Sequence, residues 1–187
     1  MTSAEREFVV GQLVASEARL LDVAGGLTLT QVNFGTARER WSIAEVVEHL
    51  VVWESFMLNA VRGALAASPE PEKQVTVSEK DRLVLGLATS RDQPLKAREA
   101  AQPTGRWNDA SELMAEFRSR RAQTVEFAEK TQADLRSHFF LHIVFGELDC
   151  YQWLVAMGQH SLRHVAQIEE VMRDPGFPVD VEERARS

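Results

Sequence analysis

The chain has 187 residues, of which 44% are hydrophobic and 26% charged, and its formal net charge is −7. This composition is that of an ordinary globular protein, and the length predicts a single domain over residues 1–187. The acidic balance argues against a nucleic-acid-binding protein, which needs a basic surface. No apolar run reaches the roughly 18 residues that a membrane span requires.

Two further features predict a cytoplasmic location. The first residues, MTSAEREFVV, are charged and polar rather than typical of a signal peptide. The single cysteine, Cys150, cannot form an internal disulfide, as expected in a reducing compartment. We therefore expect the cytoplasm, with neither a membrane nor a nucleic acid as partner.

The first predicted helix covers about residues 4–24, with Ser3 as its expected N-cap. Its apolar residues recur at the spacing of three and four that places them on one helical face. They are Val9, Val10, Leu13, Val14, Leu20 and Leu21. Gly25 and Gly26 are expected to end the helix.

The second predicted helix covers about residues 43–67. Ser42 and Glu45 have the spacing of a capping box, in which each side chain accepts a hydrogen bond from the other residue's backbone N–H. Pro69 and Pro71 are expected to follow the end of the helix, because proline lacks the N–H that a helix interior uses.

Residues 68–108 form the least regular part of the chain. The stretch SEKDRLVLGLA is compatible with a short helix, and residues 91–107 are interpreted as a connection because they contain Pro94, Pro103 and Gly105. A connection of this length favours a bundle with a crossover over one with four tight turns. Whether it covers a site or supports a dimer is left open by the sequence.

The third and fourth predicted helices cover about residues 110–131 and 150–173. Asp109 with Glu112, and Asp149 with Gln152, are the expected caps at their starts. The stretch between them is interpreted as a linker without regular structure. Together the four patterns predict an all-α protein, a four-helix bundle with a long crossover connection between the second and third helices.

Helical periodicity also assigns residues to the surface and the core. The expected solvent face of the fourth helix comprises Gln152, Gln159, Arg163 and Glu170. A solvated face is also expected for Arg118, Arg120 and Arg121, although an anion site there is a minor alternative. The large aromatic residues are assigned to the core rather than to substrate stacking: Trp41, Trp53, Phe56 and Trp153.

Two histidines of the fourth helix, His160 and His164, are candidate metal ligands. Residues four apart lie on one face of a helix, so both imidazoles can reach one ion. The spacing alone is weak support, since such pairs are often only solvated. However, both residues fall at the boundary between the core and solvent faces, and so does His49 of the second helix. If these helices are neighbours, three imidazoles converge and leave open positions, as in catalytic metal sites.

Other metal motifs fit less well. HSLRH lacks the glutamate of the zinc-protease HExxH motif, and the Glu-x-x-His motifs of di-iron bundles are absent. His138 and His142 form a rival pair, but they lie in the expected linker and are interpreted as supporting or structural residues. Three nitrogen ligands would suit zinc, nickel, iron or copper.

Two stretches resemble a known family. GELDCYQWLVAMGQHSLRHVAQIEEV is similar to the last helix of the DinB/YfiT-like superfamily of metalloenzymes, and RWSIAEVVEHLVVWE is similar to the family's second helix. The resemblance implies a four-helix bundle, often a homodimer, in which His49, His160 and His164 bind one divalent metal, commonly nickel or zinc. Some relatives transfer low-molecular-weight thiols such as bacillithiol, or use mycothiol to isomerise maleylpyruvate.

The expected function is therefore a metal-dependent enzyme acting on small molecules, whose metal activates a thiol, as in a thiol S-transferase, or water, as in a hydrolase. The alternative is a non-catalytic, dimeric helical bundle that serves in stress response or protein interaction and holds a structural metal. Glu48 could orient an imidazole or be a solvated residue, and Gln167 could face the same site. Cys150 is interpreted as a small buried residue rather than a nucleophile.

Overall fold

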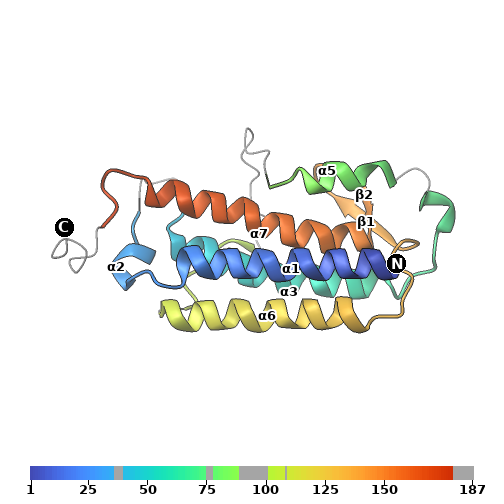
Figure 1. The fold of residues 1–187 in the computed structure, drawn as a ribbon, viewed down its shortest axis with the longest axis horizontal. Coiled ribbons are helices and arrows are strands. Elements are labelled where there is room, and N and C mark those ends of the chain that lie inside the picture. Colours follow the sequence, from blue (N-terminus) through green and yellow to red (C-terminus); the bar gives the residue numbers. More distant parts are fainter. Residues whose placement is uncertain (36–39, 75–77, 89–100, 108, 179–187) are drawn as a thin grey trace.

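Four long helices run along the length of the protein (Figure 1), which we describe from a computed structural model covering residues 1–35, 40–74, 78–88, 101–107 and 109–178. The long helices are α1 (Ser3–Ala24), α3 (Ile43–Ala64), α6 (Ala110–Lys130) and α7 (Cys150–Met172). They confirm the predicted four-helix bundle and lie within a few residues of the predicted bounds.

Smaller elements occupy the ends and one side of the bundle. The short helix α2 (Leu29–Val32) follows α1, and two 3₁₀ turns, η1 (Pro71–Lys73) and η2 (Ser78–Lys80), lead into helix α5 (Asp81–Leu85). The short helix expected after residue 77 is thus present as α5. Strands β1 (Phe139–His142) and β2 (Gly146–Asp149) pair antiparallel just before α7.

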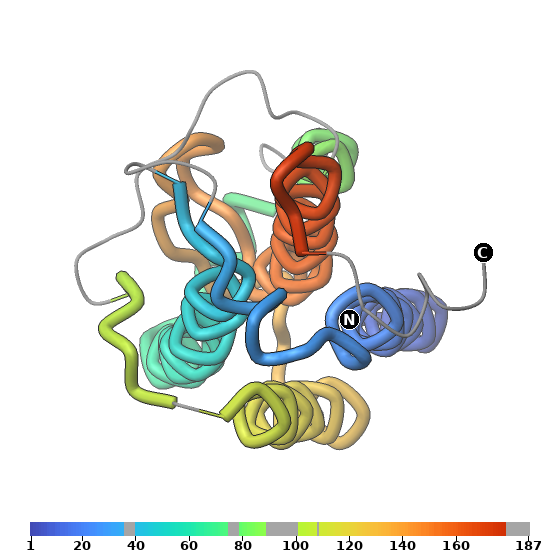
Figure 2. Tube along the Cα trace, turned by 90° about the vertical axis from the view of Figure 1, so that its left-hand side faces the viewer, coloured from blue at the N-terminus to red at the C-terminus, as the bar shows by residue number. Residues whose placement is uncertain are grey.

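The order of the helices around the bundle explains the long crossover. Seen end-on (Figure 2), α7 lies between α1 and α3, and α6 contacts both α1 and α3 on the other side. The colours of Figure 1 show that α3 and α6 run in the same direction. Since α6 starts at the end of the bundle where α3 also starts, the chain must return along the whole length of the bundle between them.

Side-chain caps fix where the long helices begin. Ser42 and Glu45 form the predicted capping box of α3, and Asp149 and Gln152 form that of α7. Asp109 caps α6 through the N–H groups of the first turn. The cap of α1 is Thr2 rather than Ser3, because the Thr2 side chain accepts from the Glu5 N–H. Each cap supplies about 1 kcal/mol of stability.

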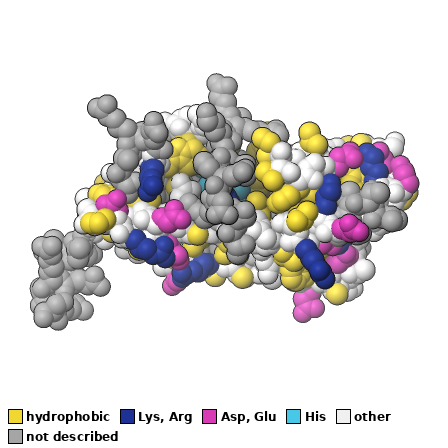
Figure 3. Space-filling model, turned by 90° about the horizontal axis from the view of Figure 1, so that it is seen from above, with side chains coloured by type: hydrophobic (Ala, Val, Ile, Leu, Met, Phe, Trp, Pro, Cys, Tyr) yellow, Lys and Arg dark blue, Asp and Glu magenta, His cyan; other side chains and the backbone are white. Residues whose placement is uncertain are grey.

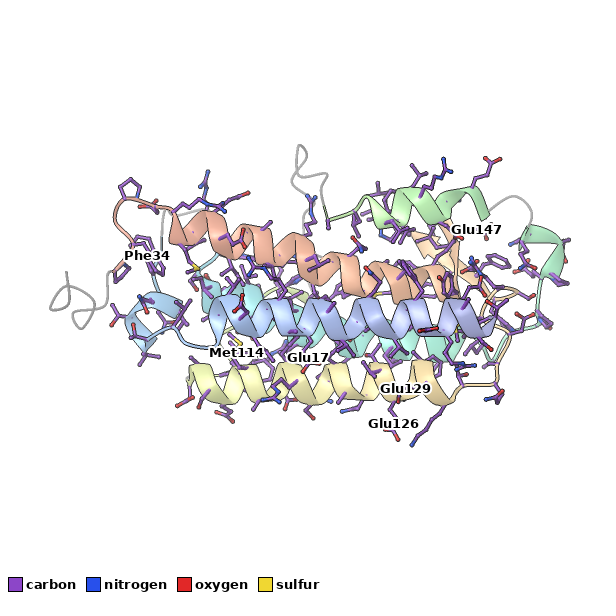
Figure 4. The ribbon with its side chains drawn as sticks, viewed as in Figure 1. Glu17, Phe34, Met114, Glu126, Glu129 and Glu147 are labelled. Carbon is purple, nitrogen blue, oxygen red and sulfur yellow. The ribbon has the colours of Figure 1, made fainter. Side chains whose placement is uncertain are left out.

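The apolar core divides into two clusters along the bundle. One surrounds Leu13, Met57 and Leu154, and the other surrounds Leu20, Leu50 and Phe117; all six side chains are buried. Met114 of α6 and Glu17 of α1 lie between their two helices, whereas Glu126 points away from the bundle (Figure 4). Among the described residues, no helix is long and apolar enough to cross a membrane.

A buried ionic network links all four long helices between these clusters. Arg121 of α6 has no exposed side-chain surface and binds both carboxylate oxygens of Glu54 on α3, at 2.8 and 2.9 Å. Its guanidinium also donates to the hydroxyls of Ser16 on α1 and Ser161 on α7, both at 2.7 Å. The prediction of a solvated Arg121 is therefore wrong: a paired guanidinium with several acceptors can be buried.

Helix α7 also exposes fewer of its residues to solvent than predicted. Gln152 and Gln159, assigned to the solvent face, are 1% and 6% exposed. Gln152 donates to Asp81 of α5, and Gln159 donates to the side chain of Gln12 on α1. Neighbouring elements thus cover a polar face that periodicity assigns to water.

Two further assignments are corrected by the structure. Phe56 is 43% exposed rather than part of the core. The expected linker before α7 contains the β1–β2 hairpin, in which Phe139 pairs with Asp149 and His142 with Gly146. Gly146 has a φ of +71°, a backbone conformation that favours glycine at this turn.

Candidate metal centre

The three predicted ligands come together between α3 and α7. One ring nitrogen from each of His49, His160 and His164 lies within 4.8 Å of the other two. The Nε2 atom of His160 is 3.4 Å from that of His49 and 3.2 Å from that of His164. Three nitrogens bound tetrahedrally to one metal at about 2.1 Å would be roughly 3.4 Å apart. Two of the three separations thus match a single divalent ion, and the third is no longer than 4.8 Å.

The position of each histidine follows from the bundle. His49 is buried on α3, and His160 and His164 are one turn apart on α7, where both keep some exposure. Since α3 and α7 are direct neighbours, the boundary faces predicted from periodicity meet. In the space-filling view of this side (Figure 3), histidine side chains are visible near the centre of the face, beside hydrophobic side chains.

Hydrogen bonds orient two of the rings. His49 Nδ1 is 2.7 Å from the Ala101 carbonyl oxygen, and His164 Nδ1 is 2.9 Å from Gln167 Oε1. Because both partners are acceptors, each Nδ1 carries the proton and each Nε2 presents a lone pair to the shared centre. Such outer partners fix the tautomer of a metal-binding histidine. Gln167 thus faces the site, as its position one turn after His164 suggested.

The donor set is chemically incomplete without a cation. His160 Nδ1 is buried and has no hydrogen-bond partner among the described residues. A single N–H on His160 Nε2 could satisfy only one of the two neighbouring lone pairs. A divalent metal, in contrast, could accept all three Nε2 lone pairs at once, so the residues present fit such an ion.

Burial keeps the rings in the form that binds metal. Desolvation lowers the pKa of His49, partly opposed by its hydrogen bond to Ala101. For His160, desolvation and then the neighbouring His164 and His49 hold the pKa well below 6.5. Neutral imidazole is the metal-ligating form, so the environment of both residues favours ligation at neutral pH.

Two indoles border the histidines. The Trp53 ring stacks on His160 with 3.9 Å between centroids and 21° between planes. The Trp41 ring lies 5.0 Å from His49. Both indoles are partly exposed. Because they also contact His49 and His160, they form apolar walls next to the candidate metal position. The assignment of Trp41 and Trp53 to the core agrees with their packing on the apolar clusters, but it did not include these contacts with histidines.

Glu48 has neither of the two roles considered from the sequence. It is 3% exposed, and its carboxylate accepts from backbone N–H groups of residues 104–106 rather than from an imidazole. The crossover segment 101–107 therefore lies against the start of α3, beside His49. The other part of the predicted connection, residues 89–100, lies outside the described residues.

The rival histidines and the cysteine lie elsewhere. His138 Nδ1 lies 3.2 Å from the Ala64 carbonyl, and His142 Nδ1 accepts from the N–H groups of Val144 and Phe145 in the hairpin turn. These contacts are structural. Cys150 is fully buried, and burial followed by the charge of Asp149 raises its thiol pKa to about 12. It is not poised as a nucleophile.

Comparisons with known proteins agree with this fold. "Uncharacterized protein YuaE" of Bacillus subtilis (strain 168) is 27% identical over 161 residues, which cover 84% of this chain and 94% of that protein. The solved structure of YfiT from Bacillus subtilis superposes with a TM-score of 0.56 at 17% identity, covering 95% of this chain and 91% of YfiT. YfiT is described as "a probable metal-dependent hydrolase with an unusual four-helix bundle topology".

A family model extends this similarity to nearly the whole bundle. The model described as the DinB superfamily matches residues 12–168, from the middle of α1 to the last turns of α7. The match contains α3 and α6 entirely and includes all three converging histidines. The match agrees with the resemblance of the second and last helices to this family. The chain therefore belongs to the DinB superfamily.

Proposed function

We propose that this protein is a metal-dependent enzyme acting on small molecules, with one divalent transition metal held by His49, His160 and His164. The observation that carries the proposal is the convergence of the three Nε2 atoms, two of them with lone pairs fixed by hydrogen bonds at Nδ1. Zinc and nickel are the candidate ions, because imidazole nitrogen suits both.

The ligand count supports catalysis over a purely structural metal. Structural zinc sites generally have four protein ligands, whereas catalytic sites have three and an open position. A divalent ion bound here would act as a Lewis acid and lower the pKa of a water or thiol in its open position. The potential ligands that converge in the described part of the chain are the three histidines.

The surrounding residues contribute orientation and exclusion of water. Ala101 and Gln167 hold the rings of His49 and His164, and the Trp53 indole covers one face of His160. The Glu48 carboxylate already accepts N–H groups of residues 104–106, so it is not free to act as a general base. This arrangement favours a reaction in which coordination itself activates the nucleophile.

Hydrolysis is the first reaction to test, because the structurally similar YfiT is described as a probable metal-dependent hydrolase. Thiol transfer is the second, because of the sequence resemblance to thiol-using relatives. Both reactions start with the same activation step, and they differ in whether water or a small thiol occupies the open position. A homodimer remains a prediction from the resemblance.

The first experiment measures metal binding. Chelator-treated protein is titrated with Zn²⁺ or Ni²⁺ by calorimetry, and one ion per chain is expected. His49→Ala, His160→Ala and His164→Ala should each lose most of the affinity. His138→Ala is the control, since the His138 ring lies away from the three histidines, with its Nδ1 against the Ala64 carbonyl. Equal affinity in the wild type and the three ligand variants would contradict the proposed site.

The second experiment separates the functions. The metal-loaded protein is assayed on a panel of small esters and amides, and separately for conjugation of small thiols to a model electrophile. Turnover that depends on the metal and disappears in His160→Ala would support an enzyme and identify the nucleophile class. Tight metal binding without turnover on either panel would favour the non-catalytic bundle.

A further inference from the structure

Two consecutive residues of α3 hold the same piece of the crossover. The Glu48 carboxylate accepts N–H groups of Thr104 at 2.8 Å, Gly105 at 2.9 Å and Arg106 at 3.3 Å. One residue later, His49 Nδ1 donates to the Ala101 carbonyl at 2.7 Å. The segment is thus attached to α3 at two adjacent points, of which one is a candidate metal ligand.

The turn at residues 104–106 is built for an anion. Successive backbone N–H groups point to one carboxylate, an arrangement that proteins use to bind negative charge. Gly105 has a φ of +73°, which a residue with a side chain rarely adopts. Glu48 itself is 3% exposed, and its charge is compensated by these N–H groups, by the Thr104 hydroxyl at 3.3 Å and by the Arg106 guanidinium, whose Nε lies 3.8 Å from Oε1.

The position of the turn decides where the Ala101 carbonyl lies. Ala101 is 5% exposed and precedes the turn by three residues. Hydrogen bonds from this segment to the rest of the described chain are made by two groups of α3, the Glu48 carboxylate and the His49 ring. Without the first attachment, we expect the carbonyl to lose its alignment with Nδ1, so that His49 can place its proton on either nitrogen.

We propose that Glu48 is a positioning residue for the metal centre: it anchors the turn at 104–106 so that the Ala101 carbonyl locks His49 in the tautomer with a free Nε2 lone pair. Glu48 acts through the backbone of the crossover and does not touch the metal. The consequence for metal affinity depends on the proposed function, whereas the effect on the His49 tautomer does not.

Two variants test the proposal from opposite sides of the contact. Glu48→Gln keeps the shape of the side chain but places an NH₂ group against N–H donors. Gly105→Ala leaves α3 unchanged but strains the turn, because of the positive φ of Gly105. Glu126→Gln is the control, as Glu126 lies on the outer surface of α6 and pairs only with Lys130 among the described residues (Figure 4). Circular dichroism checks that each variant is folded.

The main readout is the tautomer of each histidine in metal-free protein, from long-range ¹H–¹⁵N NMR above the ordinary histidine pKa of about 6.5. We expect a single Nδ1–H form of His49 in the wild type and in Glu126→Gln. Both Glu48→Gln and Gly105→Ala should give mixed tautomers at His49, while His164 keeps its form through Gln167. Metal affinity should fall by about 10- to 100-fold, as for other outer partners of ligating histidines.

The outcomes separate the two claims. If His49 keeps one Nδ1–H tautomer in folded Gly105→Ala and Glu48→Gln, the positioning role of Glu48 is wrong, whatever the metal affinity. If the tautomer becomes mixed but the wild type binds no metal, the positioning role stands and the proposed function fails. Should Glu48→Gln not fold, Gly105→Ala alone decides, because its substitution lies outside the bundle helices.

Discussion

The Trp53 indole stacks on the imidazole of His160, with 3.9 Å between the ring centroids. Trp53 belongs to α3 and His160 to α7. Their contact therefore lies in the interface between these two helices, where the three histidine nitrogens also converge. If His160 binds a metal as proposed, the Trp53 ring lies close enough to respond to the bound ion.

Tryptophan fluorescence should therefore fall when Ni²⁺ binds, because a paramagnetic ion quenches an indole at short range. We expect Trp53→Phe to remove much of the quenching and Trp41→Phe to remove a smaller part, since the Trp41 ring is 5.0 Å from His49. Trp153→Phe is the control: its indole donates to the Phe140 carbonyl and stacks on Phe140. Quenching that persists unchanged in Trp53→Phe would place the ion elsewhere.

Metal binding should also raise the melting temperature. An ion that binds only the folded state at 100 times its Kd stabilises the fold by about 2.7 kcal/mol. For a chain of this size that corresponds to a shift of roughly 5–10 °C. Calorimetric melting with and without chelator measures it. The shift should vanish in His164→Ala and remain in His138→Ala, and a shift of equal size in both variants would argue against the three-histidine site.

The thiol of Cys150 should be unreactive in the folded protein. Burial raises its pKa to about 12, so the thiolate that reacts with alkylating agents is scarce below that pH in the native state. Iodoacetamide at pH values near the ordinary cysteine pKa of about 8.5 should label the chain only after denaturation. Cys150→Ala should retain metal binding and any metal-dependent turnover. Rapid labelling of native protein, followed by mass spectrometry, would contradict this environment.

Removing one member of the buried Arg121–Glu54 pair should destabilise the fold more than replacing both members. Arg121→Met leaves the Glu54 carboxylate buried without its partner, and we expect a loss of about 3–5 kcal/mol in the free energy of unfolding. The double variant with Glu54→Met should recover much of this loss, since no charge is then stranded. Urea denaturation measures all three proteins.

The hydroxyls of this network help to interpret the double variant. Ser16 and Ser161 would still donate to the carbonyls of Leu13 and Met157, so they keep hydrogen bonds without Arg121. Arg120→Met is the matched control, because Arg120 forms a partly exposed pair with Glu116 on the same helix. If Arg121→Met costs no more than Arg120→Met, the network is not the link between helices that the contacts indicate.

The sequence predicted the helices and the convergence of three histidines, because both depend largely on local periodicity. His49, His160 and His164 lie at the edge of apolar stripes, and the packing of α3 beside α7 is enough to bring them together. The start of each helix was also predictable for α3, α6 and α7, since Ser42, Asp109 and Asp149 cap through side chains close in sequence.

The missed features depend on contacts distant in sequence. Arg121 resembles its neighbours Arg118 and Arg120, and its burial depends on partners from other helices, above all Glu54 of α3. The Ala101 carbonyl is a backbone group, so no residue type signals that it will meet His49. The hairpin had a weak signal, the alternation in FFLH and the glycine at position 146, but strands this short carry little pattern.

Because α3 and α6 are parallel, the connection between them must span the length of a helix. A helix of 22 residues such as α3 is about 33 Å long, and roughly ten extended residues would suffice to travel back along it. The connection between Ala64 and Ala110 is several times longer than that minimum. The surplus contains α5 and the turn at 104–106, so the part of the chain that closes the topology also supplies backbone groups next to the three histidines.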